Sequence, residues 1–294
     1  GACMQTALFI AGGLAAVMSA FAAFIAWTLW RRLTGQHMPR MENKRRRALI
    51  EPYITMLYPP GDGPHPCVLI LHGCGGVRRV NQTYAEAAVK AGCAAMIVDS
   101  LAPRGITYEM ALAQVCSGRV LWGRERAGDL YAALDIARDD PKIDAARLAL
   151  AGWSHGGWTI LDALALDRDG QPPDGMKHAP EAPFRGVAGV FLIYPYCSGP
   201  ALARRKPIDP PGPVEAIFVE DDSMAKEDDV IAILEKARED GASVRWTTYG
   251  GVTHGFDEPD HHPDSPLRYD GEATAMAKTQ FVAFLKRRLK PKPA

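Results

Sequence analysis

Ser154 lies in a segment that could make its hydroxyl group a nucleophile. The segment reads GWSHGG over residues 152–157 and follows the apolar run 148–151. Glycines two positions before and two positions after a serine, between a strand and a helix, are the pattern of a nucleophile elbow, where larger side chains would collide with neighbouring backbone. The alternative is an ordinary serine at a helix N-cap. The two interpretations differ in whether the rest of the chain supplies a base for Ser154.

Two later turns supply an acid and a histidine. A serine hydroxyl is a weak nucleophile, so it needs a base within hydrogen-bond reach and a third group that orients the base. The apolar run 216–219 opens into EDDSM, which contains Asp222, and the run that ends at Tyr249 opens into GGVTHGF, which contains His254. The order serine, acid, histidine, with each residue after a strand, is that of α/β hydrolases. The alternatives are that Asp222 caps the following helix and that His254 is an ordinary loop histidine.

The segments around these turns predict the sheet that must position them. Strands are expected at 53–58, 67–71, 94–98, 148–151, 187–194, 214–219 and 243–249, and helices at 83–91, 124–138, 158–166, 226–240 and 272–289. Short apolar strands that alternate with longer helices indicate a mostly parallel sheet with helices on both faces. In such sheets the functional residues gather in the loops after the strands. Residues 99–123 are expected to form one long loop there.

With these motifs in place, the chain resembles the dienelactone hydrolase family of the α/β-hydrolase superfamily. The matching segments are HGCGG at 72–76, GWSHGG, the acidic turn and HGF at 254–256, and they span nearly all of residues 49–290. The resemblance implies an α/β-hydrolase fold and a serine hydrolase that cleaves an ester or lactone through an acyl-enzyme, without a cofactor. The family pattern G-x-x-D-x-M favours Asp222 as the acid, although Val219 replaces the glycine, and Asp221 is the alternative. The founding members use cysteine where this chain has Ser154.

The resemblance also implies an oxyanion hole made by backbone N–H groups. One donor is expected at His155, directly after the nucleophile, and the other at Cys74. Candidate pocket residues are His72, Arg104, Arg119, Trp153 and Tyr196.

Other roles in these loops are expected as follows. Arg104 and Arg119 could bind a substrate carboxylate, or hold their loop through salt bridges. The side chain of His155 is expected in the pocket wall, whereas His261 and His262 are expected on the surface.

The composition limits the kinds of molecule that the protein is expected to bind. The chain has 294 residues and a formal net charge of +0, so it offers no global electrostatic case for binding nucleic acid. The partner implied is a small ester or lactone substrate. The six cysteines contain no CxxC pair, so no metal site is expected. If a disulfide forms, Cys116 and Cys197 are the expected pair, since both lie in loops predicted around the active-site mouth; buried free thiols are the alternative.

The N-terminal region has the composition of a membrane span. Residues 6–30 carry no charge, and a helix of this length would be about 37 Å long, enough to cross a bilayer. A cleaved signal peptide is the alternative. Basic residues gather after the span, at Arg31, Arg32, Arg40, Lys44, Arg45, Arg46 and Arg47, and predict a cytoplasmic catalytic domain. The expected organisation is an anchor segment 1–32, a basic juxtamembrane linker 33–48 and a catalytic domain 49–294.

Two alternative kinds of function are open. An acyltransferase or a peptidase would use the same triad, whereas a membrane-tethered binding module would not use it for catalysis. The pattern favours the hydrolase, because the nucleophile, acid, base and oxyanion loops all occur in order.

Overall fold

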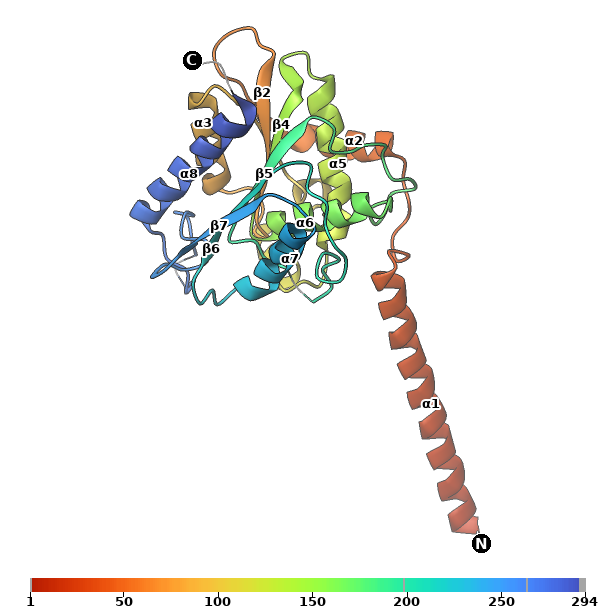
Figure 1. Cartoon of the computed structure of the whole chain (residues 1–294). Helices are drawn as coiled ribbons and strands as arrows, with labels where there is room; N and C mark the ends of the chain where they lie inside the picture. The colour runs from red at the N-terminus through yellow and green to blue at the C-terminus, as the bar shows by residue number, and fades with distance from the viewer. Residues whose placement is uncertain (1, 198, 263, 291–294) are drawn as a thin grey trace. The chain divides into compact units, whose positions relative to one another are not determined.

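The computed structural model describes residues 2–197, 199–262 and 264–290, and side chains from Gly13 onward. The chain divides into two compact units: the first ends at Arg40 and the second begins at Met41. The first unit contains the helix α1 (Ala2–Leu33). The second unit contains a seven-stranded sheet with the spatial order β1-β3-β2-β4-β5-β6-β7 (Figure 1).

The strands are β1 (Ile54–Leu57), β2 (His65–Leu71), β3 (Ala94–Val98), β4 (Ile143–Trp153), β5 (Val187–Ile193), β6 (Val214–Val219) and β7 (Val244–Tyr249). The strand β1 pairs antiparallel with β3, and all other neighbours are parallel. The predicted mostly parallel sheet is therefore confirmed. Parallel strands end at the same edge, so the loops after β2, β4, β6 and β7 meet there.

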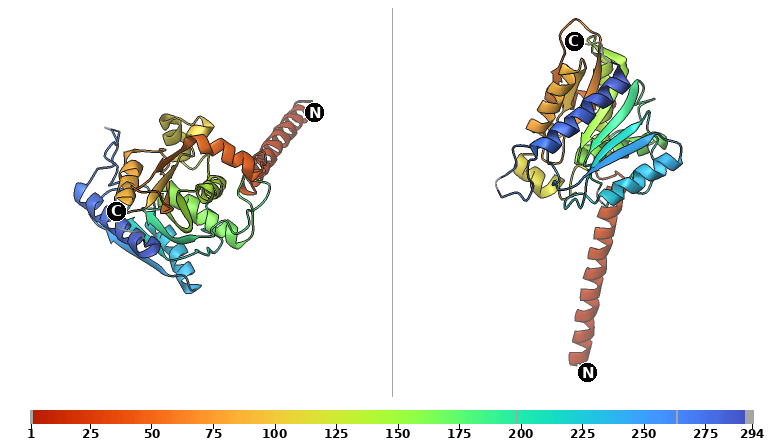
Figure 2. Two further views of the ribbon diagram at one scale, coloured as in Figure 1. Left: turned by 90° about the horizontal axis from the view of Figure 1, so that it is seen from above. Right: turned by 60° about the vertical axis from the view of Figure 1, so that its left-hand side comes forward.

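The helices of the second unit are α2 (Asn43–Ile50), α3 (Arg79–Lys90), α4 (Tyr108–Met110), α5 (Gly123–Asp139), α6 (His155–Arg168), α7 (Glu227–Glu239) and α8 (Gly271–Leu289). Successive side chains along the strands point to opposite faces of the sheet and form two hydrophobic cores. One core lies under α5, α6 and α7, and the other lies under α3 and α8. Figure 2 shows α3 and α8 side by side on their face of the sheet. Burial on both faces explains why the strands read as continuous apolar runs.

Several predicted bounds differ from the structure. The strand β4 begins at Ile143 rather than residue 148, and the helix α6 begins at His155 rather than residue 158. The helix α3 begins at Arg79 rather than near residue 83, and the Asn81 side chain stabilises its first turn, since the backbone N–H of Arg78 donates to Asn81 Oδ1 at 3.0 Å. The expected loop 99–123 contains a 3₁₀ turn (Ala102–Arg104), α4 and a π-helical turn (Ala111–Val115). These turns are too short to show a helical period in the sequence.

The linker expected over residues 33–48 is also shorter in the structure. The helix α2 belongs to the second unit and packs on α5. Arg46 in α2 is buried and pairs with Asp129 at 3.1 Å, and Ile50 is fully buried in the core. Some residues of the basic helix α2 are therefore part of the folded core, and the second unit begins at Met41 instead of residue 49.

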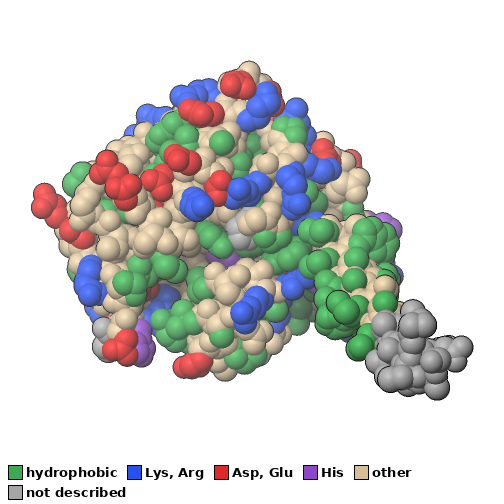
Figure 3. All heavy atoms as spheres, turned by 90° about the horizontal axis from the view of Figure 1, so that it is seen from below, with side chains coloured by type: hydrophobic (Ala, Val, Ile, Leu, Met, Phe, Trp, Pro, Cys, Tyr) green, Lys and Arg blue, Asp and Glu red, His purple; other side chains and the backbone are tan. Residues whose placement is uncertain are grey.

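The helix α1 is long and apolar enough over Gly13–Leu33 to cross a membrane, and a signal sequence near an N-terminus would meet the same test. Hydrophobic side chains cover the described part of α1 that Figure 3 draws. The helix is thus a candidate membrane span or signal sequence.

Replacing Arg46 with Met should lower the free energy of unfolding by about 3 kcal/mol, because the buried Asp129 would keep only one arginine partner. Lys44→Met is the matched control: it removes an exposed charge from the same helix and should change the free energy by less than about 0.5 kcal/mol. Urea unfolding of the full chain in detergent measures both. Equal stabilities of the two variants would contradict the structural role of Arg46.

Candidate active site

Ser154 stands on a strained turn between β4 and α6. Its φ is 48° and its ψ is −112°, a conformation that non-glycine residues rarely adopt. Glycines make the turn possible: a Cβ on Gly156 would lie 2.2 Å from the carbonyl oxygen of Leu71, and one on Gly152 would lie 2.7 Å from the carbonyl carbon of Gly156. The turn is thus the geometry expected of a nucleophile elbow.

The structure brings Ser154, His254 and Asp222 together from the ends of three strands. His254 Nε2 lies 2.9 Å from Ser154 Oγ, and His254 Nδ1 lies 2.7 Å from Asp222 Oδ2. The other carboxylate oxygen of Asp222 accepts the backbone N–H groups of Met224 and Ala225. In this arrangement His254 can take the proton of Ser154, and Asp222 can orient the imidazole.

Asp221, the alternative acid, points elsewhere. It is exposed and has a φ of 53°, and its backbone N–H donates to the side chain of Glu227 at 3.1 Å. Of the two aspartates, Asp222 contacts His254 and Asp221 does not.

Sequence reasoning missed two residues that hold His254. The ring of Tyr194 lies 4.6 Å from the imidazole, and its hydroxyl donates to the buried Asp257 at 2.5 Å. Trp153 Nε1–H donates to the same carboxylate at 3.1 Å. Burial raises the pKa of Asp257, against the effect of these donors. Asp257 therefore links the loop that contains His254 to Trp153, the residue before Ser154. Its position three residues after His254 is the sequence signal that could have identified it.

The expected oxyanion donors lie beside Ser154. His155 is the first residue of α6, where backbone N–H groups have no acceptor within the helix. The loop HGCGG after β2 approaches the nucleophile, since a Cβ on Gly73 would lie 3.6 Å from Ser154 Cβ, and Cys74 lines the same cavity as Ser154.

The disulfide predicted between Cys116 and Cys197 is wrong. Cys74 and Cys116 form the bond, and Cys197 is a buried free thiol whose pKa is raised by burial. The reason is the π-helical turn Ala111–Val115, which the sequence did not reveal and which carries Cys116 to the HGCGG loop. The bond ties an expected oxyanion residue to the segment that covers the cavity.

A cavity of about 170 Å³ opens in front of Ser154. Its apolar wall includes Tyr108, Leu112, Tyr196, Met224 and Leu267, and polar side chains that line it are Arg78, Asn81, Glu258, Asp260 and His261. Figure 3 views the molecule from below, where side chains of several kinds surround hollows in the surface.

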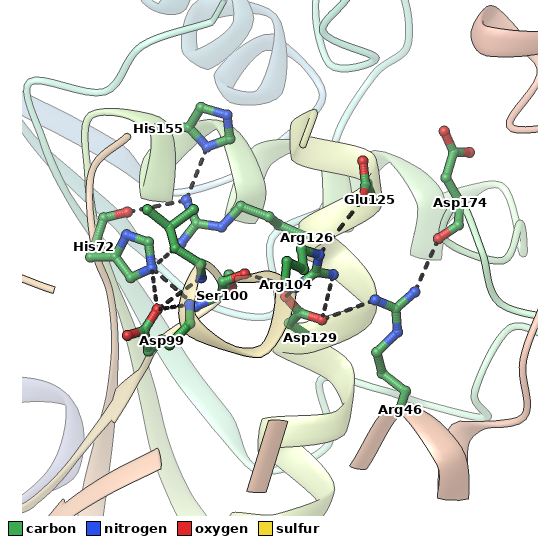
Figure 4. Close-up of polar contacts among 12 residues, drawn as sticks. Arg46, His72, Asp99, Ser100, Arg104, Glu125, Arg126, Asp129, His155 and Asp174 are labelled. Atoms are coloured by element: carbon green, nitrogen blue, oxygen red, sulfur yellow. Dashed lines mark hydrogen bonds and ion pairs between the residues drawn. The ribbon is translucent and has the colours of Figure 1, made fainter. Parts of the chain in front are cut away.

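Two of the five predicted pocket residues line this cavity, namely Trp153 and Tyr196, and three do not. Arg119 is exposed and does not line the cavity. His72 is fully buried behind the loop that it begins, where its Nε2 accepts the backbone N–H of Ser100 at 3.1 Å. Arg104 forms a buried two-point ion pair with Asp129, at 2.8 and 3.1 Å, which is the salt-bridge alternative (Figure 4).

One prediction about the other histidines is wrong: the side chain of His155 is fully buried against Trp158 rather than in the pocket wall. His261 lies in a loop and is partly exposed, and it also lines the cavity, where its Nε2 hydrogen-bonds to the carbonyl of Gly255 at 2.9 Å. His262 is exposed, as expected.

Arg126 joins the two segments that are expected to hold the oxyanion. Its guanidinium donates to the carbonyl oxygen of His72 at 3.2 Å and to His155 Nδ1 at 2.9 Å (Figure 4). Arg126 is fully buried, and burial lowers its pKa to about 10, which still leaves it charged at neutral pH. Burial, together with this charge, lowers the pKa of both His72 and His155. Nothing in the helical pattern of residues 124–138 distinguished Arg126 from a surface residue.

The comparisons with known proteins agree on family and fold. The model of the dienelactone hydrolase family matches residues 54–289. A dienelactone hydrolase-like promiscuous phosphotriesterase, P91, from metagenomic libraries is 20% identical with a TM-score of 0.54, over 78% of this chain and 88% of P91. Esterase 2 of Thermogutta terrifontis, phosphonylated by cyclosarin, is 14% identical with a TM-score of 0.60, over 81% and 90%.

An esterase from the archaeon Pyrobaculum calidifontis is 18% identical with a TM-score of 0.53, over 80% of each chain. A search of curated sequences finds no match. At these identities the likeness shows the fold alone, and it confirms the predicted α/β-hydrolase fold.

Replacing Arg126 with Met should slow the reaction of Ser154 with a fluorophosphonate by at least tenfold, because the two peptides expected to hold the developing oxyanion would lose their common anchor. Arg126→Lys, which keeps the charge but not the fork of donors, should react at an intermediate rate. Labelling time courses give the rates, and thermal unfolding shows whether the variants are folded. A folded Arg126→Met variant that reacts at the wild-type rate would contradict this role.

Proposed function

Because the chain belongs to the dienelactone hydrolase family, we propose that it hydrolyses carboxylic esters or lactones through an acyl-enzyme formed on Ser154. The observation that carries the proposal is the continuous relay Ser154–His254–Asp222, with contacts of 2.9 and 2.7 Å. The cavity in front of Ser154 gives a small ester room to reach the nucleophile.

The reaction proceeds in two halves. His254 accepts the proton of Ser154 as Oγ attacks the carbonyl carbon, and Asp222 stabilises the imidazolium that forms. The backbone N–H groups of Cys74 and His155 bind the oxyanion of the tetrahedral intermediate. The intermediate collapses, the alcohol leaves with the proton of His254, and water then repeats the attack on the acyl-enzyme to release the acid.

The names of two similar structures support a site that reacts with phosphorus electrophiles. P91 is described as a promiscuous phosphotriesterase, and the Thermogutta esterase is described as phosphonylated by cyclosarin. We expect Ser154 likewise to attack phosphorus electrophiles, which makes a fluorophosphonate a suitable probe. An acyltransferase or peptidase with the same residues is distinguished by adding alcohol or amine acceptors and analysing the products. A binding module would neither turn over esters nor react with the probe.

Ser154→Ala should abolish both fluorophosphonate labelling and p-nitrophenyl acetate hydrolysis, because the nucleophile is gone. Asp222→Asn should lower kcat by about 10⁴-fold, because an amide at this place favours the wrong tautomer of His254. Asp221→Asn is the matched control, one residue away and exposed, and should stay close to wild type. Persistent labelling of Ser154→Ala would overturn the nucleophile, and a larger loss in Asp221→Asn than in Asp222→Asn would overturn the acid.

For the location of the enzyme we propose that α1 directs the second unit to an oxidising compartment, as a membrane anchor or as a signal sequence. The argument is the Cys74–Cys116 disulfide, since such bonds persist mainly outside the cytoplasm. The proposal opposes the cytoplasmic location expected from the basic residues after the span. Arg46 and Arg47 of that cluster form ion pairs with Asp129 and Asp139, so the fold itself accounts for them. In the anchored form the lipid bilayer is the partner of α1.

Thiol trapping of the full chain in intact cells should find Cys74 and Cys116 protected from alkylation until a reductant is added, and protease added outside the cytoplasmic membrane should digest the second unit. Cys93, which is buried as a free thiol, serves as the internal control for alkylation after unfolding. Free Cys74 and Cys116 thiols in a protease-protected protein would instead establish the cytoplasmic location.

A further inference from the structure

One wall of the cavity in front of Ser154 is a short helical segment, made of α4 and the π-helical turn that follows it. Three of its side chains line the cavity: Tyr108, Leu112 and Cys116. They are spaced four residues apart, and residues at this spacing lie on the same face of a helical turn. The three side chains therefore form one face of the segment, turned toward the substrate.

Both ends of this face are attached to the HGCGG loop. Tyr108 packs against the loop at Gly75, where a Cβ would lie 3.2 Å from Tyr108 Cε2. Cys116 is bonded to Cys74. Leu112 stands between these two attachments, so its position at the cavity is fixed by the fold.

Two apolar side chains of the cavity are open to solvent. Leu112 is 46% exposed, and Met224 in the acidic turn is 47% exposed, although both line the cavity. A side chain that lines a cavity and is also half-exposed lies at its mouth. Single exposed apolar residues are common on protein surfaces, but two at the mouth of one catalytic cavity indicate a substrate with an apolar part that reaches that far.

The charged side chains of the cavity disfavour a substrate carboxylate. Among the described lining residues Arg78 is the one Lys or Arg. Its guanidinium donates to the carbonyl of Asp260 and lies 3.7 Å from the carboxylate of Glu258. The same guanidinium lies 4.7 Å from the centre of the Tyr108 ring. Since Glu258 and Asp260 also line the cavity, an uncharged substrate fits it better than an anionic one.

We propose that Leu112 and Met224 form a subsite for the alkyl chain of an uncharged ester, an inference that rests on the proposed function and names its substrate class. The chain would extend from the carbonyl group at Ser154 to the mouth of the cavity and cover apolar surface that the two side chains expose. Each methylene that leaves water in this way is expected to raise kcat/KM by about threefold. An acetyl group is too short to gain from the subsite.

The test measures the dependence of kcat/KM on chain length with the full chain in one detergent. The acyl series is p-nitrophenyl acetate, butyrate and hexanoate, and the alcohol series is ethyl, butyl and hexyl acetate. In at least one series kcat/KM should rise by about tenfold or more from the shortest to the longest ester. Mono-p-nitrophenyl adipate, which has the length of the hexanoate and ends in a carboxylate, should be a poorer substrate than the hexanoate.

A flat dependence in both series, or preference for the adipate, would overturn the subsite while hydrolysis of the acetates still supports the hydrolase. No turnover of any of these esters by the wild type would overturn the proposed function, and the subsite with it.

Two variants assign the preference to the residues. Leu112→Ser and Met224→Ser each remove apolar surface at the mouth and should lower the ratio of kcat/KM between the longest and the shortest ester by about threefold. The loss should appear in KM, because the chain binds away from the reacting atoms. Met110→Ser is the matched control: Met110 is 41% exposed, two residues before Leu112, and does not line the cavity. Its ratio should equal that of the wild type, measured in the same detergent.

An unchanged ratio in both Leu112→Ser and Met224→Ser would overturn the assignment, and so would an equal loss in Met110→Ser. Thermal unfolding shows whether the three variants are folded.

Discussion

The close approach of α6 to the end of β2 is the constraint on which the site depends. Gly156 lets the first turn of α6 touch the carbonyl of Leu71, with no space for a Cβ between them. Leu71 is followed by the HGCGG loop, so the same contact that forces Ser154 into its strained turn also places Cys74 beside it. The proposed nucleophile and oxyanion donors are therefore assembled by backbone packing, which suits a hole that must exist before charge develops.

The base and the acid reach this point by a different route. The strands β6 and β7 are parallel and in register over their whole length, so the turns that carry Asp222 and His254 leave the sheet at the same edge. Loops are mobile unless anchored. Asp222 is fixed by two backbone N–H groups, and the His254 loop by Asp257, whose partners Trp153 and Tyr194 come from β4 and from the end of β5. The proposed triad is thus held by backbone hydrogen bonds to Asp222 and by buried side-chain hydrogen bonds to Asp257.

Features that depend on neighbouring residues in the chain could be predicted from the sequence, and features that depend on contacts between distant residues could not. The strands β3 and β6 were predicted with the bounds that the structure has, because each is a short apolar run between turn residues. Ser154, Asp222 and His254 were found because chain order and position after a strand are readable along the sequence. The helix α2 was missed because its basic residues resemble a solvated linker, and the partner of Cys116 was missed because it depends on a π-helical turn without a sequence signal.

The buried charge of Arg126 explains why two histidines near Ser154, His72 and His155, would not compete with His254 as the base. His72 and His155 are fully buried, and burial together with the charge of Arg126 lowers the pKa of both, so they remain neutral. Each is also engaged by Arg126, His155 through its Nδ1 and His72 through its carbonyl and its Nε2. His254 alone faces both the serine hydroxyl and a carboxylate that can stabilise its protonated form. In the proposed reaction, proton transfer is directed to His254 because His72 and His155 lie beside a charge that disfavours protonating them.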